Sequence, residues 1–100
     1  MNSVKNPYTA ILDMPVEATE YPFTFPQFTK RIMFWMRNPG IYLNYAWHPG
    51  HVATPTDPYS QLLPGVMRQI ENFEADGPIT CYFATPTGSG ANTLQLEFWT

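Results

Sequence analysis

The stretch from residue 29 to residue 47 constrains the fold more than any other part of the chain. It reads TKRIMFWMR, then NPG, then IYLNYAW, so two arms rich in aromatic and branched residues flank a Pro-Gly turn. The side chains of the first arm alternate between two faces, with Ile32, Phe34 and Met36 on one and Arg31, Met33, Trp35 and Arg37 on the other. A period of two is typical of β-strands, so this stretch predicts a β-hairpin with one buried face. Because a single hairpin is marginally stable in water, other strands must pack on it.

Four other segments have the composition or the alternation of strands. They are residues 8–12, 19–25, 79–84 and 92–100. Pro22 stands inside the second segment, and because proline lacks a backbone donor, we expect that strand at a sheet edge or at a bulge. Short strands separated by turn signals predict an all-β fold. We expect an antiparallel β-sandwich (jelly-roll-like) of about seven to eight short strands, with a small barrel as the other arrangement.

Residues 61–73 admit two interpretations. Apolar residues recur there at helical spacing, namely Leu63, Val66, Met67, Ile70 and Phe73, which favours a short amphipathic helix. Against a helix, Pro64-Gly65 is good turn chemistry, and a glycine early in a helix would weaken it. The residue pattern therefore leaves this segment open between a helix and extended structure.

Length and composition indicate one small domain. One hundred residues support a single core, so we expect a single β-sandwich domain over residues 1–100, with polar residues 1–7 as a loose arm. Aromatic residues make up 16% of the chain and charged residues only 13%, about half the usual quarter. Either the aromatic side chains simply fill the core, or part of the surface is buried against a neighbour; the low charge favours the neighbour.

Charge and residue usage exclude several classes of function. The net charge is −3 with five basic residues, so the basic patch that phosphate binding needs is missing, and we expect no nucleic acid partner. No apolar run is long enough to span a membrane, and the first residues do not read as a signal peptide. We therefore expect a protein that is made in a cytoplasm and is kept there or released by lysis.

No cluster of residues indicates an enzyme. His48 and His51 form the sequence HPGH, with Asp57 as the nearest carboxylate in the loop, and a metal ion needs three or four ligands. The TGSG run within residues 85–90 lacks the lysine and the following helix of a phosphate-binding loop, and it predicts a hairpin loop. Cys81 is the single cysteine and lies in an apolar strand, which favours a buried inert thiol. We expect no catalytic residue, no metal and no cofactor.

Two regions are candidate protein interfaces. Met33, Trp35 and Arg37 lie opposite the predicted core face of their strand, and one core can use only one face. Either the sandwich covers both faces of this strand, or Met33 and Trp35 meet another subunit, where Trp and Arg are typical hot-spot residues. The second region is the proline-rich loop of residues 48–60, since loops of that length are often functional. Its candidate contact residues, together with the tryptophan before it, are Trp47, His48, His51 and Tyr59.

The order of these segments resembles that of small all-β virion proteins of tailed bacteriophages. The resemblance lies in an aromatic strand (Tyr21-Pro-Phe-Thr-Phe-Pro), the strand from Thr29 to Arg37, a Tyr-rich strand, the turn Leu63-Pro64-Gly65, the strand Cys81-Tyr82-Phe83 and the final strand Leu96-Glu97-Phe98-Trp99-Thr100. It covers most of the chain and lies in the order of the segments rather than in one motif. It implies a β-sandwich, and it implies that residues 66–73 are extended.

Two functions follow from these observations. The resemblance implies a non-enzymatic virion structural protein, made in the cytoplasm of the bacterial host. It would dock as multiple copies on the capsid as a decoration or cement protein, or at the neck or tail. Its partners would be other virion proteins and itself, as a homo-oligomer, with neither nucleic acid nor membrane. The alternative is a carbohydrate- or ligand-binding β-sandwich, in which Trp47, Tyr59 and the long loop form a stacking platform.

Overall fold

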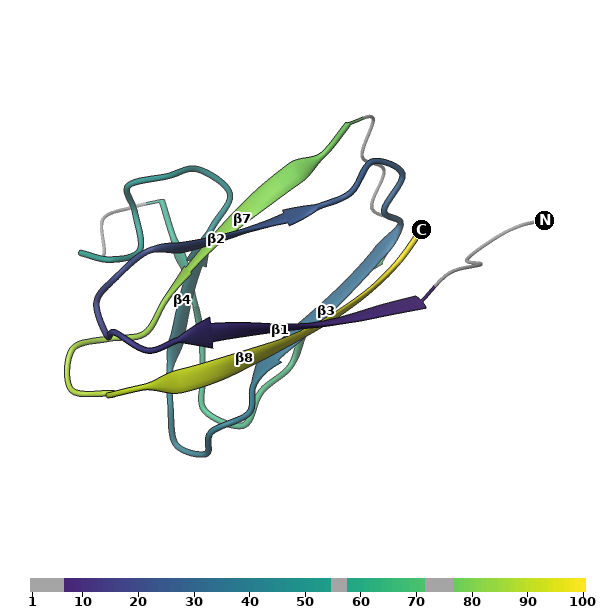
Figure 1. Ribbon diagram of the computed structural model, residues 1–100. Coiled ribbons are helices and arrows are strands. Elements are labelled where there is room, and N and C mark those ends of the chain that lie inside the picture. Colours follow the sequence, from purple (N-terminus) through teal and green to yellow (C-terminus); the bar gives the residue numbers. More distant parts are fainter. Residues whose placement is uncertain (1–6, 55–57, 72–76) are drawn as a thin grey trace.

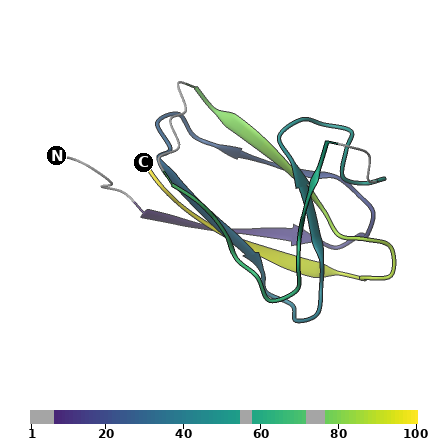
Figure 2. The ribbon, with the colours of Figure 1, turned by 180° about the vertical axis from the view of Figure 1, so that it is seen from behind.

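The structure, a computed structural model, describes residues 7–54, 58–71 and 77–100. These residues form eight strands and no helix, so the predicted all-β fold is confirmed. The strands are β1 (Pro7–Met14), β2 (Tyr21–Phe25), β3 (Arg31–Met36), β4 (Leu43–Ala46), β5 (Ser60–Leu62), β6 (Arg68–Ile70), β7 (Ile79–Ala84) and β8 (Asn92–Trp99). They are arranged as two layers (Figure 1), which Figure 2 shows from behind.

The two layers are four-stranded antiparallel sheets. Sheet A has the strand order β1-β8-β3-β6, and sheet B has the order β2-β7-β4-β5. The chain crosses from one sheet to the other at every connection except that from β4 to β5. This is the arrangement of a double-sheet jelly roll, so the jelly-roll-like sandwich predicted from the sequence is confirmed. β2 lies at an edge of sheet B, where Pro22 predicts it.

The hydrophobic core lies between the two sheets. Sheet A contributes Met14, Ile32, Phe34, Leu94, Leu96 and Phe98, and sheet B contributes Phe25, Leu43, Tyr45, Leu62, Cys81 and Phe83. The ring of Phe34 meets the rings of Tyr45 and Phe83 edge-on, with centroids 5.1 Å away in both cases. Edge-to-face contacts of this kind add to the energy of burial. The alternation read from the sequence therefore assigned the inward face of β3 and β8 correctly.

β3 and β4 do not pair with each other, so the predicted hairpin over residues 29–47 is wrong. β3 pairs with β6 and β8 in sheet A, whereas β4 pairs with β5 and β7 in sheet B. The connection is tied to β8 instead of closing a tight turn. The Thr93 N–H donates to Asn38 Oδ1 at 2.8 Å, and the Arg37 N–H donates to the Thr93 carbonyl at 2.9 Å. Alternation describes one strand at a time, and it does not identify the partner strand.

Residues 85–90 also connect the two sheets and do not form the predicted hairpin loop. Glu17 from the connection between β1 and β2 holds this segment, because the Gly90 N–H donates to Glu17 Oε2 at 2.7 Å. The Ala18 N–H donates to the Thr85 carbonyl at 2.8 Å. A backbone amide that a phosphate-binding loop would offer to a ligand is thus bonded to a carboxylate of the same chain, which agrees with excluding that motif.

Residues 61–71 contain no helix, so the helical spacing is wrong for them, and residues 66–71 are extended, as the resemblance implies for 66–73. β5 ends at Leu62, and a turn follows in which the Val66 N–H donates to the Leu63 carbonyl at 3.2 Å. Gly65 adopts a φ of 78°, a left-handed conformation that glycine reaches without strain. β6 then pairs with β3. Residues 72 and 73 lie outside the described residues.

β1 is longer than residues 8–12 predict. It pairs with β8 from Pro7 opposite Trp99 to Met14 opposite Asn92. Pro7, which was expected in a loose arm, is therefore the first residue of the strand, and residues 1–6 lie outside the described residues. Because its partner β8 is eight residues long, β1 pairs over its whole length and not only over residues 8–12.

Candidate binding surfaces

The outer face of sheet A carries Met33 and Trp35, and both are partly exposed. Met33 lies opposite Glu97 of β8, and Trp35 lies opposite Gln95. On the other side of β8, Gln95 lies opposite Ile11 of β1, whose side chain is 48% exposed. Apolar side chains thus stand on β3 and β1, with the polar Gln95 and Glu97 of β8 between them, on a face that the core does not use. This outer face of sheet A is therefore a candidate docking surface.

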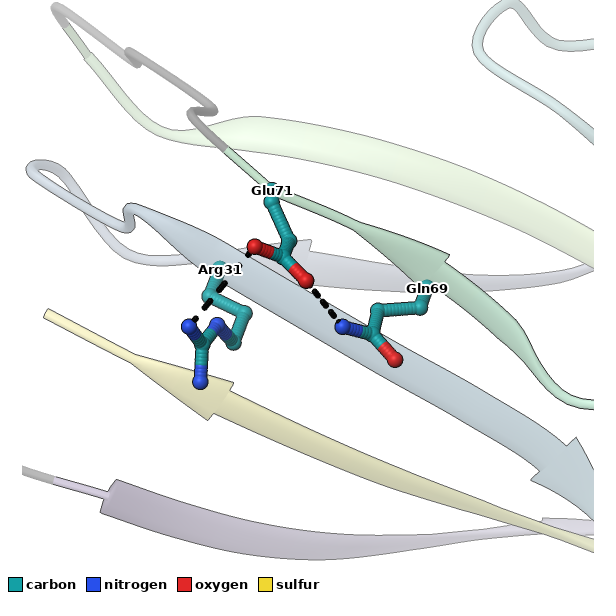
Figure 3. A network of polar contacts seen from close by, with 3 residues as sticks. All are labelled: Arg31, Gln69 and Glu71. Carbon is teal, nitrogen blue, oxygen red and sulfur yellow. Dashed lines mark hydrogen bonds and ion pairs between the residues drawn. The ribbon is translucent and has the colours of Figure 1, made fainter.

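Polar contacts surround these apolar side chains near the start of β3. An Arg31 nitrogen lies 3.8 Å from Glu71 Oε1, and Gln69 Nε2 donates to Glu71 Oε2 (Figure 3). The guanidinium carbon of Arg31 lies 5.5 Å from the ring centroid of Trp99. Because Arg31 and Glu71 are both largely exposed, their ion pair contributes little to stability. Arg37, at the other end of the strand, is exposed.

A second apolar surface lies at one end of the sandwich, and we call it the end patch. It consists of four side chains that are each at least 42% exposed: Tyr42, Leu63, Val66 and Met67. Leu43 pairs with Leu62, which brings the connections β3–β4 and β5–β6 to the same end. The sequence does not single out this surface, because the helical spacing assigns Leu63, Val66 and Met67 to the apolar face of a helix and Tyr42 stands in a different segment.

The segment between β4 and β5 folds back over the outer side of sheet B. Val52 is buried against Ala46 and Ala84, which point away from the main core. The Gly50 N–H donates to Glu20 Oε1 at 2.8 Å, which ties the HPGH turn to the connection between β1 and β2. This segment therefore has a small apolar core of its own.

A cleft lies beside this segment, where the end of β4 meets the start of β7, and we call it the sheet B cleft. It has a volume of about 620 Å³ and is lined by Trp47, His48, Pro49, Pro78, Ile79, Thr80 and Tyr82. A smaller hollow of about 200 Å³ is lined by Tyr45, Ala46, Trp47, His48, Pro58, Tyr59 and Ser60. Trp47 and His48 line both, so they form a ridge between the two hollows.

The predicted interface residues fall into two groups on opposite sides of the sandwich. Met33, Trp35 and Arg37 belong to β3 or follow it in sheet A. The other four follow β4 or precede β5: Trp47 and His48 line both hollows, Tyr59 lines the smaller one, and His51 lines neither. Sequence reasoning missed Thr80 and Tyr82 of β7. Their alternation with the buried Cys81 was the signal that places them on the outer face.

The described residues offer little for metal binding or catalysis. None of their His, Cys, Asp and Glu side chains gather in a group of three or more that could hold a metal ion, and Asp57 lies outside this part of the chain. Cys81 is buried in the core, as predicted, and burial raises the pKa of its thiol to about 12. A thiol with so high a pKa is almost entirely protonated near neutral pH and is a poor nucleophile.

Comparisons of the chain with protein-family models, curated proteins and solved structures find no match. Within the described ranges, the chain has no helix of the length and hydropathy that a bilayer crossing requires. The surfaces described above are therefore the features from which a function is inferred.

We expect Glu17→Gln to lower the melting temperature near pH 7. Backbone N–H groups of Gly88 and Gly90 hold the pKa of the Glu17 carboxyl below its usual 4.5. The ionised carboxylate therefore stabilises the fold above the pKa of the unfolded chain, and this stabilisation is lost as pH falls through the lower folded pKa. Thermal unfolding followed from about pH 7 down to about pH 3 should show the difference between variant and wild type shrinking. A difference that stays constant over this range would contradict the role of the Glu17 charge.

Proposed function

We propose that the protein is a non-enzymatic virion structural protein of a tailed bacteriophage. It docks as multiple copies on the capsid, or at the neck or tail, through the outer face of sheet A. The observation that supports this most is the partial exposure of Met33 and Trp35 on a strand whose other face places Ile32 and Phe34 in the core. A strand offers two faces, and the described sandwich fills only one of them.

The composition of this face supports a protein partner. Trp, Met and Arg are enriched at protein interfaces, and truncation of a central Trp often costs about 2 kcal/mol or more of binding energy. Trp35 and Met33 stand between Arg31, the first residue of β3, and Arg37, which follows the strand. The double-sheet jelly roll also occurs in viral capsid domains, although the same architecture occurs in lectins. Fold alone does not assign function, so the side chains of the face carry the proposal.

The edge strands support self-association of the same sheet. Three of the four edge strands are protected against pairing with another chain. β5 and β6 are short, with three residues each, and β2 contains Pro22. β1 has eight residues, with Asp13 as its one charged side chain. Antiparallel pairing of β1 between two copies, in a register that keeps both outer faces on the same side, would join their A sheets. Neighbouring copies would then present one continuous docking face.

Trp35→Ala tests the docking face. The isolated subunit should remain folded, because Trp35 lies outside the core cluster. Its incorporation into particles of the encoding phage should be lost, since a hot-spot tryptophan has been removed from each copy. Complementation of a deletion phage, followed by mass spectrometry of purified particles, measures incorporation. Normal incorporation of a folded Trp35→Ala protein would overturn the assignment to this face.

The matched control is Tyr42→Ala, which removes an exposed aromatic ring from the end patch. It should be incorporated at the wild-type level if docking uses the outer face of sheet A. Loss of incorporation in Tyr42→Ala together with normal incorporation of Trp35→Ala would move the docking site to the end patch. Absence of the wild-type protein from purified particles would contradict the virion function itself.

A further inference from the structure

The sheet B cleft has the size and the lining of a small-molecule site. Its volume of about 620 Å³ falls inside the range of roughly 300–1,000 Å³ that is usual for ligand pockets. Thr80 and Tyr82 of β7 contribute to it from the outer face of the sheet, and Trp47 contributes an indole ring from the end of β4. The described residues that line the cleft come from sheet B and its connections, whereas the proposed docking face belongs to sheet A.

The wall of the cleft is held in place before any ligand arrives. His48 and Pro49 belong to the segment that the buried Val52 fastens to Ala46 and Ala84. The hydrogen bond from the Gly50 N–H to Glu20 fastens the same turn from the other side. A preformed wall spares the ligand the entropic cost of ordering a loop.

The lining points to a neutral ligand with both apolar and hydroxyl groups. Trp47, Tyr82 and His48 supply aromatic rings, and among the described residues that line the cleft none is Asp, Glu, Lys or Arg. Recognition of a phosphate or a carboxylate normally uses Arg or Lys, so an anionic ligand fits poorly. On the outer face, the hydroxyls of Thr80 and Thr24 lie 2.8 Å apart and are hydrogen-bonded to each other, which places donors and acceptors beside the rings.

We infer that the cleft binds a neutral saccharide. A pyranose ring has a C–H face that packs on an aromatic ring and a rim of hydroxyls that hydrogen-bond to groups such as the Thr80 hydroxyl. The smaller hollow lies across the ridge of Trp47 and His48 and is lined by Tyr59. A second sugar unit packs there, so the ligand class is a neutral oligosaccharide rather than a single sugar. This inference is independent of the docking function.

A glycan array that holds neutral and sialylated or sulfated oligosaccharides tests the inference. The full-length protein should bind neutral members, and isothermal titration with the best neutral glycan should then give a Kd of about 1 mM or tighter. His48→Ala removes an exposed side chain of the ridge and should weaken binding about tenfold or more. Tyr82→Ala removes a ring from the floor and should weaken binding at least as much.

Tyr42→Ala is the matched control, because it removes a tyrosine ring far from the cleft lining and should leave the Kd unchanged. Circular dichroism of each variant separates lost binding from lost folding, and His48→Ala keeps the test valid if Tyr82→Ala unfolds. The inference is overturned if no neutral glycan binds, if acidic glycans alone bind, or if folded His48→Ala binds as tightly as wild type.

Discussion

Phe34→Ala is expected to lower the free energy of unfolding by about 3–5 kcal/mol, which is the usual cost of deleting a buried phenylalanine ring. Phe34 is fully buried, and its ring meets Tyr45 and Phe83 of the opposite sheet. The substitution would leave a cavity between the two sheets at the centre of the core. Because a domain of this size has only about 5–15 kcal/mol of stability, the variant should unfold at a much lower urea concentration.

The neighbouring residue provides the control for this measurement. Trp35 is next in the chain and larger, but it stands on the outer face of the same strand. Trp35→Ala should therefore cost much less stability than Phe34→Ala, although it removes more atoms. Urea unfolding followed by circular dichroism gives both values. Equal losses in the two variants would mean that both faces of β3 are buried in the isolated subunit, and the docking face would lose its main support.

The Cys81 thiol is expected to react with a disulfide reagent at least about a thousandfold more slowly in the folded protein than in the unfolded chain. Burial raises its pKa from 9.0 to about 12. Near pH 8, a thiol with a pKa of 9.0 is about 10% ionised, whereas a thiol with a pKa of about 12 is only about 0.01% ionised. The thiolate is the reacting species, so its scarcity slows the reaction, although a thiolate of higher pKa is intrinsically more nucleophilic. Exclusion of the reagent by the surrounding core accounts for the rest of the factor.

Absorbance of the released thiol in about 0 M and about 6 M urea measures the two rates. In the native protein, the reaction should proceed no faster than the chain unfolds, so Phe34→Ala should accelerate it. Complete modification of the native protein within seconds would show that Cys81 is accessible. It would also contradict the placement of β7 between β2 and β4 with this side chain in the core.

The sequence by itself determined which face of β3 and of β8 is inside. Alternation in β3 and β8 placed Ile32, Phe34 and Leu96 in the core and left Met33 and Trp35 outside, and the structure agrees. This succeeds because alternation is a local property: successive side chains on an extended chain point to opposite sides. In the same way, the missing donor of Pro22 limited β2 to a sheet edge or a bulge, and β2 lies at an edge.

One candidate site could be predicted from the sequence, and the other only from the tertiary structure. Met33 and Trp35 could be named from the sequence, because the outward face of one strand contains both. The sheet B cleft could not, although Trp47, His48 and Tyr59 were singled out, because Thr80 and Tyr82 come from a strand much later in the chain. Only the pairing of β4 with β7 brings the two stretches together.

Tertiary structure alone decided which strands pair. The two arms of residues 29–47 looked like a hairpin, yet β3 and β4 lie in different sheets. Both arms present an apolar face, and either arrangement would bury it. In the jelly roll the chain crosses between the sheets after β3. β3 then pairs with β8 and β6, and β4 pairs with β7 and β5. Each arm then has two hydrogen-bonded neighbours, whereas an isolated hairpin gives it one, and no local pattern records that difference.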